Sequence, residues 1–246
     1  MPLTIRALGG GKRDMNITIS ERTAEAIAAL TEGAMYTDED RMKYAKIIYD
    51  FNKLYYDLYK QTWCATSWKG IPVLKAPTDL WIYQEIITRL KPDLIIETGT
   101  MRGGSAVFLD DMCKLVNHSG RVISIDIESE KIDKRAYDSN VKFITGSSVD
   151  QDIVNIVKAH IYAYNCEKVM VILDSDHSEE HVIKELDIYS KLVTKGSALI
   201  VEDTSNSEAR EAVSKWLPEH PEFTTDIECE KLMLTFCRGG YLEKVL

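Results

Sequence analysis

One stretch of the sequence, residues 94–105, limits the possible folds of this chain more than any other. It reads Leu-Ile-Ile-Glu-Thr-Gly-Thr-Met-Arg-Gly-Gly-Ser, and an apolar-periodic segment follows from Ala106. The apolar run, the glycine-rich turn and the helical pattern predict a buried strand, a tight loop and a helix N-terminus. Such a unit holds an anionic ligand group, because backbone N–H groups at the helix start point toward the ligand.

The acid before the first glycine indicates which nucleotide-like ligand the loop would hold. A dinucleotide-binding loop has three spaced glycines and an acid about 20 residues later. Here Glu97 comes first, and the spacing is E-x-G-x-x-x-G-G. A carboxylate at that point binds a cationic amine, which a dinucleotide does not offer there, so the loop favours S-adenosylmethionine over NAD. The candidate cofactor-binding residues of this stretch are Glu97, Gly99, Thr100, Met101, Gly103, Gly104 and Ser105.

From residue 92 onward, apolar runs alternate with helical patterns. We expect strands at 93–97, 121–126, 141–145, 168–174 and 197–202, with helices near 104–116, 129–138, 150–163 and 178–194. This order predicts an α/β fold in which a parallel sheet has helices on both faces. A helix near 207–217 and two strands, 223–228 and 232–237, joined by a three-residue turn, complete the pattern. The result is a mostly parallel seven-stranded sheet with an antiparallel last strand, the Rossmann-like methyltransferase arrangement.

Residues 1 to about 90 differ in character from the rest, and we predict an N-terminal helical extension at 1–62 followed by a methyltransferase domain at 63–246. Helices are expected at 20–30, from the capping pattern at 37–40 to about residue 60, and at 80–89. Apolar residues recur at helical spacing from Met42 to Leu58, and six aromatic residues lie between Tyr44 and Tyr59. They favour a packing stripe, with a substrate wall or a subunit interface as alternatives, and leave a homo-oligomer possible.

Composition excludes several classes of function. The 246 residues carry a formal net charge of −9, which argues against a general binder of nucleic acid or anionic membranes. The five cysteines form no C-x-x-C pair, which favours a reducing compartment. We find no signal-peptide pattern and no apolar run of membrane-spanning length. A cytoplasmic protein is therefore expected.

Polar residues at the predicted strand ends supply the rest of a cofactor site, because ligands bind beyond the carboxyl ends of the strands in such sheets. Asp126, followed by Ile127, is the candidate for the ribose hydroxyls, and a helix N-cap is the alternative. Ser147 and Ser148 would border the adenine. The alternative there is capping of the next helix by Ser148 or Asp150.

Acids at the next two strand ends predict a metal site. Asp174 and Asp176 follow one strand, and Glu202 and Asp203 follow the other. Four ionised carboxylates would repel one another unless protons, hydrogen bonds or a cation offset the charge. Oxygen ligands in this number favour a hard divalent ion such as Mg²⁺, with helix capping and solvated loop acids as the alternative.

A histidine next to these acids is the candidate general base. His177 lies three residues past Asp174 and would take a proton from a metal-bound hydroxyl. A capping or merely exposed histidine is the alternative. His181 follows four residues later, and a transition-metal site formed by the two histidines is the less favoured interpretation.

Five blocks of the sequence, in order and suitably spaced between about residues 63 and 205, resemble a known family. They are Trp81-Ile-Tyr-Gln-Glu-Ile-Ile, the block Lys91–Ala106, Arg121-Val-Ile-Ser-Ile-Asp-Ile, Leu173-Asp-Ser-Asp-His-Ser and Ile200-Val-Glu-Asp-Thr. They are similar to the cephalosporin hydroxylase and rhamnosyl O-methyltransferase family, and more distantly to Mg²⁺-dependent catechol-type O-methyltransferases.

The resemblance implies roles at the matching positions. Glu97 and the loop to Ser105 would hold the methionine part of S-adenosylmethionine, Asp126 the ribose and Ser148 the adenine. Asp174 (or Asp176), Glu202 and Asp203 would hold the metal. His177 stands where catechol-type enzymes have a lysine base.

We therefore predict an S-adenosylmethionine- and Mg²⁺-dependent O-methyltransferase, with Asp174 and His177 at the reacting centre. Its acceptor would be a small molecule or a saccharide, such as a sugar, a glycosylated natural product or a polysaccharide. The alternatives are a hydroxylase or methoxylation component acting on a cephalosporin-like molecule, and a non-catalytic ligand-binding subunit of a biosynthetic complex.

Overall fold

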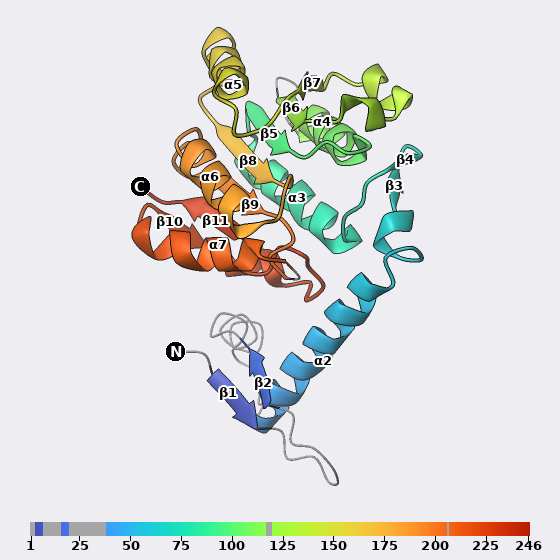
Figure 1. Ribbon diagram of the computed structural model, residues 1–246, viewed down its shortest axis with the longest axis vertical. Helices are drawn as coiled ribbons and strands as arrows, with labels where there is room; N and C mark the ends of the chain where they lie inside the picture. The colour runs from blue at the N-terminus through green and yellow to red at the C-terminus, as the bar shows by residue number, and fades with distance from the viewer. Residues whose placement is uncertain (1–2, 7–15, 20–37, 117–119, 206) are drawn as a thin grey trace.

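The computed structural model describes residues 3–6, 16–19, 38–116, 120–205 and 207–246 (Figure 1). Within these residues, the helices are α2 (Asp38–Asp57), α3 (Pro77–Leu90), α4 (Gly104–Val116), α5 (Gln151–Ala163), α6 (Glu179–Tyr189) and α7 (Ala209–Trp216). The strands are β1 (Leu3–Arg6), β2 (Asn16–Ile19), β3 (Ser67–Trp68), β4 (Ile71–Pro72), β5 (Leu94–Thr98), β6 (Arg121–Asp126), β7 (Lys142–Thr145), β8 (Val169–Leu173), β9 (Ala198–Val201), β10 (Phe223–Thr225) and β11 (Tyr241–Lys244).

A seven-stranded sheet forms the centre of the molecule. Its strand order is β10-β11-β9-β8-β5-β6-β7. The five strands from β5 to β9 pair in parallel, whereas β11 pairs antiparallel with both β9 and β10. The predicted fold class, including the reversed last strand, is confirmed. Because β5, β6, β8 and β9 are parallel, their carboxyl ends lie at one edge of the sheet.

Helices cover both faces of this sheet, as the alternation of buried side chains along the strands requires. On one face, Ile96 of β5 belongs to a core cluster with side chains of α5, α6 and α7. On the other face, the neighbouring Ile95 packs in a cluster with side chains of α3 and α4. Figure 1 shows these two helical layers on either side of the strands.

The C-terminal strands correct the sequence-based prediction. Residues 227–230 form a short 3-10 helix, and the last strand is β11 rather than 232–237. The apolar character of 232–237 comes from packing: Phe236 is buried, and its ring lies edge-on to Trp63 and Tyr56. Gly240 explains why the chain can return to the sheet here, since a Cβ at this position would lie 2.3 Å from the Val201 carbonyl oxygen.

Smaller corrections concern helix boundaries. The segment 129–138 contains two short 3-10 helices, 129–131 and 134–138, instead of one α-helix. Helix α6 ends at Tyr189 rather than near 194, and α3 begins at Pro77, three residues earlier than expected. Proline is well suited to the first turn of a helix because its missing N–H has no intrahelical partner there.

Helix α2 extends from the sheet domain (Figure 1) and is tied to it near its C-terminal end. The Asn52 side-chain amide donates to the Met233 carbonyl oxygen and accepts from the Thr235 N–H. β1 and β2 pair antiparallel, which the helical prediction for residues 1–62 did not include. The helix predicted at 20–30 lies outside the described residues.

Candidate functional site

Residues from the loops after five strands meet at the carboxyl edge of the sheet, and the glycine loop after β5 lies among them. Gly99 has a φ of +82° and packs against the loop after β8. A Cβ at Gly99 would lie 1.8 Å from the Asp174 carbonyl oxygen. The Asp174 N–H in turn donates to the Thr98 carbonyl oxygen at 3.1 Å. The predicted cofactor loop and the predicted metal loop are therefore in direct backbone contact.

The rest of the glycine loop brings the start of α4 close to β4. Gly103 has a φ of +82°, and a Cβ on Gly104 would lie 2.2 Å from the Pro72 carbonyl oxygen. The Thr100 hydroxyl lies 2.7 Å from that of Ser124. Met101 is 42% exposed, which leaves its side chain available to a ligand.

Glu97 is fully buried beneath this loop. Its Oε2 accepts from the Ser124 hydroxyl at 2.7 Å, and the Ser105 hydroxyl also bonds to the carboxylate. Burial raises the pKa of Glu97, while the positive charge of Lys75 opposes that rise. Its Oε1 has no hydrogen-bond partner within the described part of the chain. An unpaired buried carboxylate oxygen is costly, so the donor set fits a cationic amine such as that of S-adenosylmethionine.

Asp126, at the end of β6, uses its carboxylate to hold two loops. It accepts from the Met101 N–H at 2.7 Å and from the Glu128 N–H at 2.8 Å. It thereby fixes the glycine loop and faces the same edge, and it caps no α-helix. Ile127 beside it is 67% exposed.

The loop after β7 resolves the capping alternative for the serines. Asp150 caps α5, because its side chain accepts from the Asp152 N–H. Ser148 is buried, and its hydroxyl lies 3.2 Å from Nε2 of His181, while Ser147 is half-buried. Ser148 is therefore free of a capping role.

Asp174, His177 and Asp203 form a compact group at the ends of β8 and β9. Potential metal-ligating atoms of the three lie within 4.8 Å of one another. His177 Nε2 lies 3.0 Å from Asp203 Oδ2 and 3.8 Å from Asp174 Oδ1. Burial alone would lower the pKa of His177, but the hydrogen bond to Asp203 and the charge of Asp174 raise it to about 9.

Asp203 has an uncommon backbone for a residue other than glycine, with a φ of +55°. Aspartate tolerates this left-handed region better than most residues, and the Ser207 N–H and hydroxyl both donate to the Asp203 carbonyl oxygen. Its Oδ1 is buried without a hydrogen-bond partner among the described residues. The carboxylates of Asp174 and Asp203, together with the unpartnered Oδ1 of Asp203, fit a divalent cation.

Sequence reasoning missed Lys75, a buried cation in the middle of these acids. Its Nζ lies 2.5 Å from Asp174 Oδ2 and 2.6 Å from Glu202 Oε1. The carboxylate repulsion expected from the sequence is thus offset in part by an ammonium group. The only available signal was a lysine in an apolar context, Pro-Val-Leu-Lys-Ala-Pro, ahead of α3.

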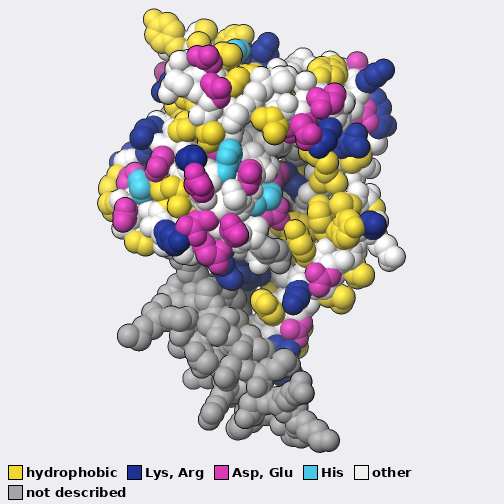
Figure 2. All heavy atoms as spheres, in the orientation of Figure 1, with side chains coloured by type: hydrophobic (Ala, Val, Ile, Leu, Met, Phe, Trp, Pro, Cys, Tyr) yellow, Lys and Arg dark blue, Asp and Glu magenta, His cyan; other side chains and the backbone are white. Residues whose placement is uncertain are grey.

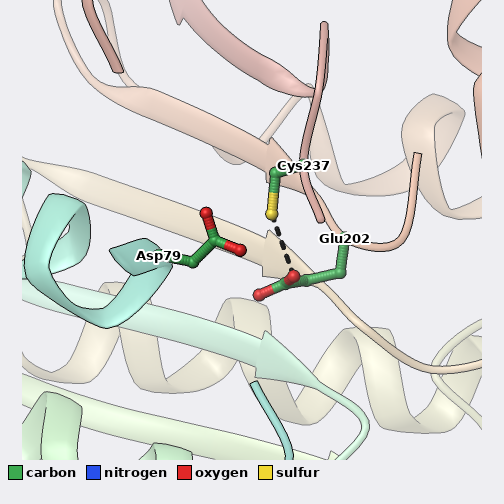
Figure 3. A group of neighbouring side chains, drawn as sticks. All are labelled: Asp79, Glu202 and Cys237. Atoms are coloured by element: carbon green, nitrogen blue, oxygen red, sulfur yellow. Dashed lines mark hydrogen bonds between the residues drawn. The ribbon is translucent and has the colours of Figure 1, made fainter. Parts of the chain in front are cut away.

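The structure places Glu202 apart from the group around His177. The Glu202 carboxylate is buried and accepts from Lys75, the Tyr83 hydroxyl and, at 2.9 Å, the Cys237 thiol. Burial would raise the pKa of Glu202, but the charge of Lys75 and these hydrogen bonds hold it below its usual value. Figure 3 shows Glu202 with Cys237 and Asp79, on the side of the sheet edge where α3 lies.

Asp176 also lies outside the group. Its Oδ1 accepts from the N–H of Ser178, the N-cap residue of α6, at 2.8 Å, so its carboxylate orders the turn that precedes the helix. His181 contacts Ser148 and Ser175 instead of joining His177. In the residues the structure describes, the potential metal-ligating groups are Asp174-His177-Asp203 and the buried Asp79-Glu202-Cys237.

Comparisons with known proteins identify the relatives of this chain. Residues 60–245 match the family described as rhamnosyl O-methyltransferase/CmcI. A rhamnosyl O-methyltransferase of Mycobacterium leprae is 31% identical over 234 residues, covering 90% of this chain and 98% of the relative. One of Mycobacterium bovis is 35% identical over 157 residues, and the match covers 63% of each chain.

The fold is similar to that of CmcI. The structure of CmcI with Mg and SAM aligns with a TM-score of 0.59 at 21% identity, covering 74% of this chain and 78% of that one. No helix in the described ranges is both long and apolar enough to cross a membrane. The family match and the identity to the M. leprae relative confirm the family predicted from the sequence, and this chain belongs to the rhamnosyl O-methyltransferase/CmcI family.

Proposed function

We propose that this chain is an O-methyltransferase that moves the methyl group of S-adenosylmethionine to a hydroxyl of a saccharide, with the help of a divalent cation. The observation that carries the proposal is the backbone contact between Gly99 and Asp174. It joins the glycine loop to the Asp174-His177-Asp203 group, so that a methyl donor held by the loop would lie beside the acids. The M. leprae relative supports the saccharide acceptor by its name.

The glycine loop and its neighbours would bind the donor. The unpaired Glu97 Oε1 would accept from its amine, and Ser105, at the start of α4, would lie near its carboxylate. Asp126 would accept from the ribose hydroxyls with the acceptor capacity that its two backbone bonds leave. Ser148 would border the adenine.

Asp174 and Asp203 would hold the cation. A bound Mg²⁺ lowers the pKa of a coordinated hydroxyl and fixes its position. Glu202 was predicted to be a ligand, but its carboxylate already accepts from three side chains. We therefore assign the direct contacts to Asp174 and Asp203, and to Glu202 the role of holding Lys75.

His177 would move the proton. Its Nε2 donates to Asp203 when the ring is charged, and it accepts a proton only as the neutral ring. A cation held by the same carboxylates favours the neutral form by charge repulsion. His177 Nε2 would then take the proton of the acceptor hydroxyl as the methyl group is transferred.

Methyl transfer is tested with labelled S-adenosylmethionine and a panel of rhamnosides and other glycosides. We expect label in a product that is heavier by one methylene group, transfer that stops in EDTA, and activity that Mg²⁺ restores. Product heavier by one oxygen atom, formed with O₂ and iron, would show that the hydroxylase interpretation is correct. Donor binding without transfer to any glycoside would favour a non-catalytic subunit.

The acceptor is proposed to be a saccharide or another small molecule rather than nucleic acid, and the net charge of −9 supports this. A cytoplasmic location is supported by all five cysteines being unpaired. A homo-oligomer remains a prediction. It is supported by the exposed apolar side chains of α2, including Ile47, Phe51 and Leu54. Hydrophobic side chains gather on the side of the molecule where α2 meets the following segment (Figure 2).

A further inference from the structure

Lys75 enters the site from outside the sheet. It lies between β4 and α3, where the Val73 N–H donates to the Thr66 carbonyl oxygen at 3.1 Å and Pro77 begins the helix. Only 2% of its surface is exposed. Lysine is almost never buried to this extent without partners, because its charge loses hydration.

The partners of Lys75 come from two neighbouring strands. Asp174 follows β8 and is partly exposed, whereas Glu202 follows β9 and is 2% exposed. The ammonium group therefore joins a carboxylate at the mouth of the site to one in the core. It also lies 5.8 Å from the centroid of the Tyr83 ring, whose hydroxyl bonds to Glu202.

The contact with Asp174 uses only one of its oxygens. Lys75 binds Oδ2, while Oδ1 faces His177 Nε2 at 3.8 Å. The carboxylate is held in one orientation, with one oxygen turned toward His177 and Asp203. A freely rotating side chain would have to be ordered each time a ligand binds.

We propose that Lys75 is a positioning residue of the methyl-transfer site, which orients Asp174 and sets the charge that the site offers to a cation. With Asp174, Glu202 and Asp203 ionised and the His177 ring neutral, one ammonium group leaves two negative charges, equal in size to the charge of one divalent ion. This inference rests on the proposed function, because that function makes Asp174 a ligand of the cation.

The first test is thermal unfolding of the full chain in EDTA and in excess MgCl₂, without donor or acceptor. Lys75→Met keeps an unbranched side chain, shorter by one heavy atom, and removes its charge. We expect a lower Tm in EDTA and a larger rise with Mg²⁺ than in the wild type, because uncompensated carboxylates attract the ion more strongly. A lysine that merely fills the core would lower Tm equally in both conditions, and that result would overturn the proposal.

The second test needs no metal and no substrate. In EDTA, a double-mutant cycle combines Lys75→Met with Asp174→Asn and follows urea unfolding. Each variant changes the equilibrium constant of unfolding by some factor. For contacting charged partners, we expect the factor of the double variant to be about tenfold smaller than the product of the two single-variant factors. Effects that simply multiply would refute the positioning role, even if the wild type proved not to bind Mg²⁺ or transfer methyl groups.

A matched control uses a surface ion pair whose lysine lies between β3 and β4, shortly before Lys75 in the sequence. Lys69 pairs with Asp111 at 2.7 Å, and its side chain is 62% exposed. The cycle of Lys69→Met with Asp111→Asn should show a coupling of no more than a few-fold. In steady-state assays, Lys75→Met should lower kcat about tenfold or more and leave KM for S-adenosylmethionine unchanged, whereas Lys69→Met should leave both at the wild-type values.

Discussion

At the scale of single residues, the structure separates the four predicted acids into different roles. Asp203 and Asp174 share His177 as a neighbour, Asp176 orders the turn before α6, and Glu202 lies in the core with Lys75. The D-S-D spacing does not distinguish Asp174 from Asp176 in the sequence, because both follow the same strand. Only the turn of the backbone after β8 decides which side chain faces the edge.

This separation predicts opposite outcomes for two similar substitutions. Asp203→Asn removes a charge and keeps a residue that tolerates positive φ, so the backbone should be retained while methyl transfer falls about 100-fold, the upper end of the losses caused by changes around a metal site. The rate of Asp176→Asn should stay within about twofold of the wild type, because an asparagine oxygen can accept the same turn bond from the Ser178 N–H. Steady-state rates at saturating Mg²⁺ measure both. Equal losses in the two variants would contradict the assignment of Asp203.

A second residue-level prediction concerns pH. The pKa of His177, raised to about 9 by Asp203 and Asp174 against burial, exceeds the usual value of about 6.5 in an unfolded chain. Charged His177 therefore stabilises the metal-free protein fully below pH 6.5, and this contribution disappears as pH rises through 9. Urea unfolding in EDTA should show His177→Gln less stable than the wild type at pH 6 and nearly equal at pH 10. A stability difference between the two proteins that does not change with pH would show that His177 carries no stabilising charge in the folded protein.

At the scale of elements, most strands and helices could be predicted because their signals are local. An apolar run between turns specified β8 and β9, and the predicted β6 agrees with the structure at both ends. The segment 232–237 was misassigned because its apolar residues serve contacts with Trp63 and Tyr56, which lie far away in the sequence. Lys75 was missed for the same reason, since its partners lie 99 and 127 residues away.

The glycine loop gives a prediction at this scale. Gly99→Ala places a Cβ 1.8 Å from the Asp174 carbonyl oxygen at a φ of +82°, so β5 and β8 must separate at their ends. We expect a loss of about 2–4 kcal/mol in unfolding free energy from strain and overpacking together, and no measurable binding of S-adenosylmethionine by calorimetry. Gly196→Ala is the control. It has a φ of +73° and open space around the Cβ, so it should cost about 1–2 kcal/mol and leave binding intact.

At the scale of the whole molecule, the candidate site depends on segments from all parts of the sheet domain. Lys75 precedes the sheet, Glu97 and Asp174 end two central strands, and Cys237 comes from the loop before the last strand. Ligands bound at this edge therefore contact segments that separate when the protein unfolds. Such ligands should stabilise the molecule as one unit, by an amount that depends on their concentration relative to Kd.

This dependence predicts separable stabilisation by the two ligands. At about 100 times Kd, each ligand should contribute about 2.7 kcal/mol to the free energy of unfolding, seen as a rise in Tm. Asp174→Asn should lose the rise caused by Mg²⁺ and keep most of the rise caused by S-adenosylmethionine. Asp126→Asn should show the opposite pattern. Because Gly99 touches Asp174, the two ligands together should raise Tm in the wild type by more than the sum of their separate effects. Strictly additive shifts would show that the loops after β5 and β8 act independently.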